Sequence, residues 1–346
     1  MMKKRTKWIA GHAAAVIAAG CMMPGSTLAK ESMEISQGMF SWFLVRAYDA
    51  ACSLNGGTTD LWENEIEGEQ PEEWILKTAK SYAEEYLAVE QKFQEEELEL
   101  PEGEIEAIET TQERYWNELG YGRYYADYGI TEEDFGDVLE HSSQISQLYE
   151  MQRAELEESV TEEEIIAYVE EHGELLQYIA VPYSDVLDEE ATAEEKEEWV
   201  DTDAIYDEYK ERLEQGENME ELVKEVSENE EQQTLGISSS YTDSAAEELF
   251  LDNNTSLSNG FQAALEEAEE EEVVYFDDEA QYYQIIFVKK PFTKDWAGLE
   301  QYREVLTSLI AGEKFEAQMK QWGEEIELAN EADLMDAEQV KEMFQN

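Results

Sequence analysis

The segment at 161–182 constrains the fold most, because its pattern changes from helix to strand within a few residues. Thr161 and Glu164 have the spacing of a capping box, in which each side chain satisfies an amide of the first helical turn. We therefore expect a helix that begins at Thr161 and ends at Gly173. The apolar run at 175–181, closed by Pro182, predicts a buried strand directly after that helix.

Upstream of this segment, apolar residues recur at three and four positions, which is the period of an amphipathic helix. The spacing predicts four helices, preceded by a short strand at 32–35. They cover 37–53, a long stretch from Pro71 up to the break at 101–103, 104–119, and a stretch from Thr131 to about Ser159.

Downstream, helical and strand patterns alternate. We expect helices at 204–215, 219–226 and 258–268, strands at 273–276 and 282–288, and a solvated acidic connector at 188–198. A last helix, from about Trp296, has an apolar side that needs a partner, and the mixed module already closes its own sheet. The sequence thus predicts an α+β protein: a mostly helical domain at 30–172 and 292–346, interrupted by a small α/β domain at 173–291.

Residues 1–29 have the features of an export signal, with four basic residues before an apolar run that is short for a membrane span. Two processing sites remain open. Cleavage before Cys21 would make this cysteine a lipid-modified N-terminus, whereas cleavage after Ala29 would release a soluble chain. Both predict an extracytoplasmic protein, either a cell-surface lipoprotein or a secreted one. At most Cys52 remains as a free thiol, so we expect no intramolecular disulfide.

The charge is strongly acidic, with 86 Asp and Glu against 23 Lys and Arg and a formal net charge of −63. Such a surface repels phosphate, so nucleic acid is excluded as a partner and a membrane is expected only through the lipid anchor. The main interpretation of the charge is solubility in a salty or acidic setting. The alternative is attraction of basic, unfolded polypeptides.

No cofactor or metal is expected from the sequence. His141 and His172 are the histidines outside the signal, and neither has the spacing of a zinc ligand, so both are expected at the surface. The carboxylates at 188–198 do not follow a calcium-loop pattern. The sequence also contains no serine in a nucleophile elbow and no glycine-rich phosphate-binding loop after a strand.

The segment at 120–128 interleaves glycine with tyrosine. It has two interpretations: a lip that binds peptides, or aromatic rings that pack between helices with their hydroxyl groups in water. Aromatic residues at helical spacing usually belong to a core, which favours the second interpretation.

Several short sequence motifs follow one another in the order found in a known family. They lie at 161–168, 177–181, 216–227, 235–236, 260–264 and 283–288. From 175 to 290 this order resembles a parvulin-type peptidyl-prolyl isomerase domain. The helical flanks resemble the extracytoplasmic foldases of the SurA and PrsA kind, in which such a domain interrupts a chaperone domain.

The resemblance also identifies candidate site residues and departures from the family. Two strand histidines of the family are replaced by Tyr178 and Gln284, and Asn229 stands where a cysteine or aspartate is usual. Leu257 and Phe261 match the apolar cup that receives a proline ring. The resemblance therefore implies substrate binding by Leu257, Phe261, Tyr178 and Gln284, with a degenerate polar centre at Tyr178, Asn229 and Gln284 and no clear catalytic residue.

These features imply a chaperone or foldase that binds unfolded or secreted polypeptides and has an impaired isomerase site. Rotation about a prolyl bond needs no nucleophile, because a site helps by desolvating the amide and stabilising its twisted form over a barrier of about 18–20 kcal/mol. The alternatives are an active isomerase with altered site residues and a non-catalytic envelope adaptor or scaffold.

Overall fold

The computed structural model describes residues 30–184, 200–242, 244–252 and 257–345. The predicted signal with Cys21 and the predicted connector at 188–198 lie outside these ranges. The chain forms two compact units: unit 1 is built from residues up to Leu156 and from Gly312 onward, and unit 2 from Glu157–Ala311. Long helices together with a small antiparallel sheet confirm the predicted α+β class. The domain boundaries at 172/173 and 291/292 stay a prediction.

Unit 1 begins with two long helices whose ends follow from their sequence. Helix α1 (Gln37–Asn55) starts after Ser36, whose hydroxyl accepts a hydrogen bond from the Met39 amide at 2.9 Å. It ends at Gly56, which has a φ of 76° that glycine adopts without strain. Pro71 opens α2 (Pro71–Glu95), where the missing amide hydrogen costs nothing. Both helices confirm the predicted segments.

The next part of unit 1 is helical but more broken than expected. Helix α3 (Glu102–Glu113) continues into a π-helical turn, η2 (Arg114–Glu118), and a short helix α4 (Tyr121–Ala126), which was not predicted, follows. Helix α5 (Glu132–Glu158) follows. Its start is fixed by the buried Asp134, whose carboxylate accepts hydrogen bonds from the Thr131 amide and hydroxyl and from the hydroxyl of Ser36, the residue that caps α1.

The two ends of the described chain meet in unit 1. Strand β1 (Glu31–Met33) pairs in parallel with β7 (Ile326–Leu328), and helix α13 (Ala337–Gln345) packs on α2. Neither β7 nor α13 was predicted. The core between α1, α2 and these C-terminal elements is apolar and fully buried at its centre, as Leu44, Ile75 and Ala79 are.

Unit 2 opens with the helix-to-strand segment predicted at 161–182. Helix α6 (Glu162–His172) has the expected capping box, with the Glu164 carboxylate accepting from the Thr161 amide at 2.7 Å. Strand β2 (Gly173–Pro182) follows without a loop. The prediction is confirmed, and the strand is two residues longer at its start and one at its end.

Strand β2 is the centre of an antiparallel sheet of five strands. Along one edge it pairs with β6 (Tyr283–Lys290), which in turn pairs with β5 (Val273–Asp278). Its other edge is shared, because β4 (Glu248–Leu251) pairs with the first half of β2 and β3 (Ser238–Ser239) with the second. The two short strands β3 and β4 were not predicted.

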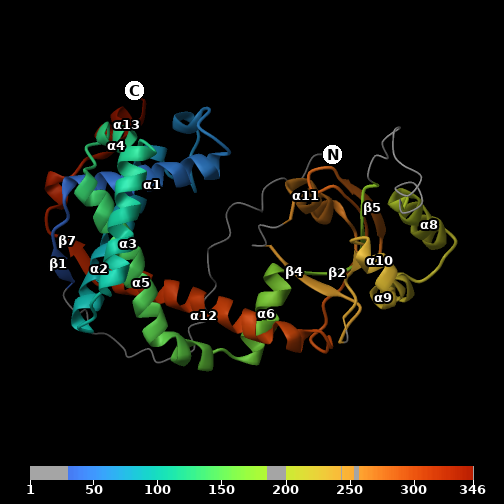
Figure 1. The fold of residues 1–346 in the computed structure, drawn as a ribbon. Helices are drawn as coiled ribbons and strands as arrows, with labels where there is room; N and C mark the ends of the chain where they lie inside the picture. The colour runs from blue at the N-terminus through green and yellow to red at the C-terminus, as the bar shows by residue number, and fades with distance from the viewer. Residues whose placement is uncertain (1–29, 185–199, 243, 253–256, 346) are drawn as a thin grey trace. The chain divides into compact units, whose positions relative to one another are not determined.

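The two faces of this sheet carry different layers, which Figure 1 shows around β2 and β5. One face packs against α8 (Thr202–Glu214) and α9 (Met219–Glu228) through Ile179, Val181, Ile286 and Val288, and the short α10 (Glu230–Thr234) follows α9. The other face packs against α11 (Asn259–Glu267) through Leu176 and Phe287. Alternation along each strand therefore decides which layer a side chain joins.

Helix α12 (Leu299–Glu324) contributes to both cores. Within unit 2, Leu299, Leu306 and Ile310 pack with Ile165 and Val169 of α6. Within unit 1, Phe315 and Met319 pack with Val89, Phe93 and Leu148, as expected for a C-terminal helix that returns to the N-terminal helices. Among the described helices, none is long and apolar enough to span a bilayer.

Candidate functional site

The α11 face of the sheet gathers three of the residues identified from sequence. Leu257, Phe261 and Tyr178 belong to one apolar cluster with Leu176, Phe250, Phe276 and Phe287. The Phe261 ring lies 5.3 Å from that of Phe287 and 5.6 Å from that of Phe276, measured between centroids. Phe261 is only 4% exposed, whereas Leu257, Tyr178 and Phe276 are half-buried. The cluster thus presents a rim of apolar side chains over a filled centre.

Helix α11 is held on this face by a buried polar contact. The Ser258 hydroxyl caps the helix by accepting from the Phe261 amide at 3.1 Å. The same hydroxyl donates to Oδ2 of Asp278, a buried carboxylate at the end of β5, at 2.6 Å. Because the cap also fixes the first helical turn, this contact sets where the Phe261 ring meets the sheet.

The hydroxyl of Tyr178 is already engaged within the fold. It donates to Oε2 of Glu248 on β4 at 2.8 Å, and its ring packs edge to face on Phe250. Burial, followed by the charge of Glu248 and this hydrogen bond, raises the pKa of Tyr178 far above its ordinary value. The phenol therefore stays protonated, and its proton is directed at Glu248.

Gln284 and Asn229 do not join this cluster. Gln284 pairs with Val181 across the β2–β6 ladder and shares the parity of Ile286, so its side chain projects toward the α8–α10 layer. Its amide oxygen is buried there and accepts no hydrogen bond from the described residues. Asn229 lies between α9 and α10, where its side chain caps α10 by accepting from the Glu231 and Gln232 amides. The structure thus separates Tyr178 from both residues by the thickness of the sheet.

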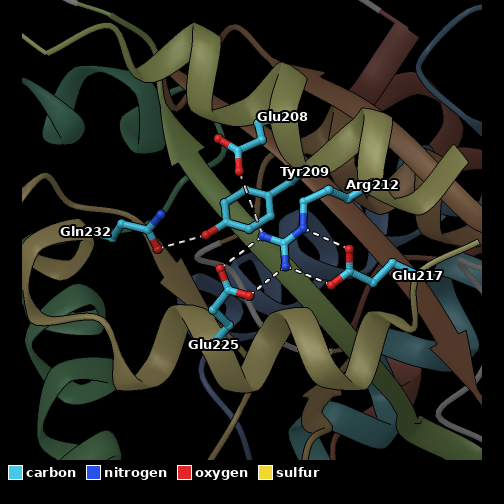
Figure 2. A network of polar contacts seen from close by, with 6 residues as sticks. All are labelled: Glu208, Tyr209, Arg212, Glu217, Glu225 and Gln232. Atoms are coloured by element: carbon cyan, nitrogen blue, oxygen red, sulfur yellow. Dashed lines mark hydrogen bonds and ion pairs between the residues drawn. The ribbon is translucent and has the colours of Figure 1, made fainter. Parts of the chain in front are cut away.

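The helical layer on that opposite face is fastened by Arg212 (Figure 2). Its guanidinium donates two hydrogen bonds to Glu217, at 2.7 and 2.8 Å, and two to Glu225, at 2.6 and 2.9 Å. It also lies over the Tyr209 ring, whose hydroxyl donates to Gln232. Arg212 lowers the pKa of both Glu217 and Glu225. These contacts join α8 to the turn before α9 through Glu217, to α9 through Glu225 and to α10 through Gln232, so the network is a structural one.

The chemistry available on the α11 face is therefore limited. Holding a twisted prolyl amide takes a hydrogen-bond donor aimed at the substrate and a desolvated apolar floor. The cluster supplies this apolar surface through its rim of Leu257, Phe276 and the Tyr178 ring, with the buried Phe261 as the floor. Among its described members, however, Tyr178 carries the one side-chain hydroxyl, and that donor points to Glu248. The face is suited to apolar contact more than to rotation of a bound amide.

A second candidate surface lies in unit 1, around α4. Tyr121 is 41% exposed and Tyr124 and Leu119 are each 52% exposed. Behind them the rings are in contact: Tyr125 packs on Tyr124, Tyr121, Trp116 and Trp42. Tyr125 packs between helices, as the second interpretation of the aromatic segment expects, whereas Tyr121 and Tyr124 face solvent and the peptide-binding interpretation stays a prediction. We call Leu119, Tyr121 and Tyr124 the aromatic lip.

Unit 1 also contains an open hollow of about 800 Å³ that was not identified from sequence. It mixes aromatic rings with carboxylates. Trp42 on α1 lines it and also packs on Tyr125, so the hollow and the aromatic lip share a supporting ring. The lining residues are Trp42, Phe43, Arg46, Asp49, Ala50, Ser53, Tyr82, Glu85, Tyr86, His141 and Glu316. A sequence signal existed in the aromatic stripe of α2, but which side of the stripe stays open depends on how α5 and α12 pack.

The expected surface position of the histidines is wrong for His141. Its side chain is 15% exposed, and its ring lies 4.4 Å from that of Tyr86. His172 is half-buried, with Nδ1 at 2.9 Å from a carboxylate oxygen of Asp252. Among the described residues, no three His, Cys, Asp or Glu side chains are placed to hold a metal ion together.

No protein-family model matches the sequence, and no curated protein matches it. The fold is similar to crystal structures of PrsA foldases. The PrsA of Streptococcus pneumoniae is 17% identical over 80% of this chain and 95% of that chain, with a TM-score of 0.31. The PrsA of Bacillus subtilis is 16% identical over 78% and 90%, with a TM-score of 0.29. That of Lactococcus lactis is 10% identical over 74% and 81%, also at 0.29. Because these identities and TM-scores are low, a function for this protein has to be argued from its own residues.

Proposed function

We propose that this protein is an extracytoplasmic chaperone that holds unfolded polypeptides, and that its isomerase-like site has lost most or all of its activity. The observation that carries the proposal is the aromatic lip, where three large apolar side chains within six residues face solvent. Monomeric soluble proteins expose apolar side chains singly, and a contiguous group indicates an interaction surface. The rings behind the lip support it, so it stays exposed when no client is bound.

The α11 face supports the second half of the proposal. Leu257, Phe276 and the Tyr178 ring offer apolar surface to a proline-containing segment, while the Tyr178 proton is committed to Glu248. Binding then continues although the Tyr178 hydroxyl, the one hydroxyl among the described members of the cluster, is not available to a twisted amide. The proposed substrate-binding residues on this face are Leu257, Phe261 and Tyr178, with Phe261 acting as the floor. Gln284 and Asn229 serve the fold and not the site.

Placement outside the cytoplasm belongs to the same proposal. We infer that residues 1–29 direct export and that Cys21 carries the lipid anchor, with cleavage after Ala29 as the alternative. We keep 30–172 with 292–346 as the chaperone domain and 173–291 as the isomerase-like domain. Metabolic labelling with a lipid precursor tests the anchor, because under this proposal the wild type is labelled and Cys21→Ala is not, whereas under the alternative neither protein is labelled.

Two assays run side by side test the function. The first measures light scattering while reduced α-lactalbumin, an acidic client, aggregates with and without the purified protein. An acidic client removes simple charge attraction to the acidic surface, so a delay reports apolar contact. The second measures the cis-to-trans rate of a proline-containing peptide. We expect a clear delay of aggregation and little or no acceleration of the peptide.

Matched variants locate the activity. Tyr121→Ser together with Tyr124→Ser removes the rings of the lip, and we expect most of the delay to be lost. Tyr282→Ser is the control, because Tyr282 is 73% exposed in unit 2 and belongs to no apolar group. A wild-type protein that leaves aggregation unchanged refutes the chaperone role. Strong peptide acceleration that disappears in Tyr178→Phe would instead establish an active isomerase with altered residues.

A further inference from the structure

The open hollow of unit 1 carries an excess of negative charge against aromatic walls. Asp49, Glu85 and Glu316 line it, whereas Arg46 is the cation among its lining residues. Three carboxylates thus face one guanidinium, with the rings of Trp42 and Tyr86 beside them. A mixture of this kind is the usual environment for a cationic ligand, because carboxylates attract the charge and aromatic faces stack on it.

Glu85 is the most buried of these carboxylates, since Asp49 and Glu316 are exposed. It is half-buried on α2, yet no described residue donates a hydrogen bond to it or forms an ion pair with it. Burial is the largest influence on its pKa and raises it. Lys320 and His141 act in the opposite direction through charge, and Glu316 raises the pKa further. A half-buried carboxylate in this position is stabilised when a cation binds beside it.

The neighbouring cations leave this part of the hollow open. Arg46 forms no ion pair with Glu85 among the described residues. Burial raises the pKa of Asp49 and the charge of Arg46 acts in the opposite direction there, as it does on Tyr82 and Tyr125. Lys320 is exposed and makes no ion pair with Glu85. The ring of His141 packs on Tyr86, and its Nδ1 atom lies 3.5 Å from Glu90, outside the lining. Glu85 and Glu316 therefore repel each other with no hydrogen-bonded cation between them.

We propose that this hollow binds the side chain of an arginine or lysine from an unfolded polypeptide, with Glu85 as the principal carboxylate and Tyr86 and Trp42 as the aromatic wall. Arginine is the better fit, because a planar guanidinium stacks on rings and pairs with two carboxylates at once. The proposal rests on the proposed function only for the source of the side chain. Under this proposal the protein prefers unfolded polypeptides in which a basic residue lies next to an apolar one.

The size of the hollow agrees with this ligand class. A space of about 800 Å³ is far larger than a metal ion needs, and the described carboxylates do not converge as metal ligands do. It lies within the range of pockets that hold small organic groups. Trp42 links the hollow to the aromatic lip through Tyr125, so a client that rests apolar residues on the lip can place a basic residue in the hollow.

The test uses short peptides and isothermal titration, and so does not depend on chaperone activity. One peptide is a Gly/Ser sequence with a central arginine and blocked ends, and the other has citrulline, the uncharged analogue of arginine, at the same position. We expect the arginine peptide to bind about tenfold more tightly, which corresponds to about 1.4 kcal/mol. Glu85→Gln should bring both peptides to the same affinity, and Asp49→Asn should reduce the difference.

Glu84→Gln is the matched control. Glu84 precedes Glu85 on α2, and its replacement by Gln removes the same charge. Its side chain, however, lines a separate hollow together with Lys77 and Lys80. We expect Glu84→Gln to keep the preference for arginine. An unchanged preference in Glu85→Gln, an equal loss in both variants, or no measurable preference in the wild type overturns the proposal. Arginine binding that survives while the aggregation assay fails would refute the chaperone role and leave this site standing.

Discussion

Two glycines of helix α12 allow a direct test of how closely its C-terminal part packs. A Cβ atom added at Gly323 would lie 3.0 Å from the amide nitrogen of Glu85, 3.1 Å from its Cα and 3.4 Å from the carbonyl carbon of Glu84. All three are backbone atoms of α2, and non-bonded carbons prefer about 3.5–4.0 Å. A Cβ added at Gly312 would meet no atom within 4 Å. The same substitution in one helix thus has two different surroundings.

The expected free energies follow from this difference. Replacing a helical glycine by alanine stabilises by about 0.5–1 kcal/mol, because the unfolded chain loses conformational freedom. We expect Gly312→Ala to show this gain. Gly323 lies closer to the helix end, and its alanine must push two packed backbones apart, which costs about 1–3 kcal/mol. Gly323→Ala should therefore be less stable than the wild type and at least 1 kcal/mol below Gly312→Ala.

Urea unfolding of the purified protein, followed by tryptophan fluorescence, provides the measurement. Both glycines belong to unit 1, so the two variants should move the same transition in opposite directions. The slope of the transition should stay constant, since neither change alters the surface exposed on unfolding. A Gly323→Ala protein as stable as Gly312→Ala would show that α2 and α12 do not approach as closely as described, and would refute the reasoning.

Three further predictions concern unit 2. Phe261→Ala should destabilise it by about 3–5 kcal/mol in urea, because it empties the centre of the α11 cluster, and a loss below 1 kcal/mol would contradict that packing. Tyr178→Phe should cost about 1 kcal/mol through the lost hydrogen bond to Glu248 and leave the prolyl rate unchanged, as measured by unfolding and peptide assays. Arg212 lowers the pKa of Glu217 and Glu225, so their stabilisation is present above about pH 4.3 and declines as pH falls through the lowered values. Arg212→Gln should therefore weaken the dependence of unfolding on pH in that acid range, and an unchanged profile would mean that the ion pairs do not form in solution.

The regular elements were predictable because their signals are local. The capping box at Thr161, the proline at the start of α2 and the apolar run of β2 each depend on a few neighbouring residues. Strands β4 and β7 escaped prediction because they are short and are stabilised by pairing with distant segments. Helix α13 was missed although its apolar residues pack on α2, because its sequence is short and highly charged.

The candidate site was harder to predict, since it depends on register. Tyr178 and Gln284 both belong to predicted strands, but their faces follow from the pairing of Tyr178 with Phe287 and of Val181 with Gln284. A sequence match places such residues in order and gives no information on which layer they join. Glu85 was equally hidden, because its importance arises from the packing of α5 and α12 around α2, elements that are far apart in the sequence.

The pairing of β1 with β7 has a consequence for a chain that emerges from its N-terminus. Glu31 can pair only after Ile326 has been synthesised. The apolar faces of α1 and α2 likewise pack against Ile326 and Leu328 and stay uncovered until then. Everything that unit 2 needs, up to Ala311, is complete earlier. During synthesis unit 2 can therefore fold while unit 1 still lacks strand β7. A chain truncated before Ile326 would contain a folded unit 2 joined to N-terminal helices whose apolar faces stay exposed.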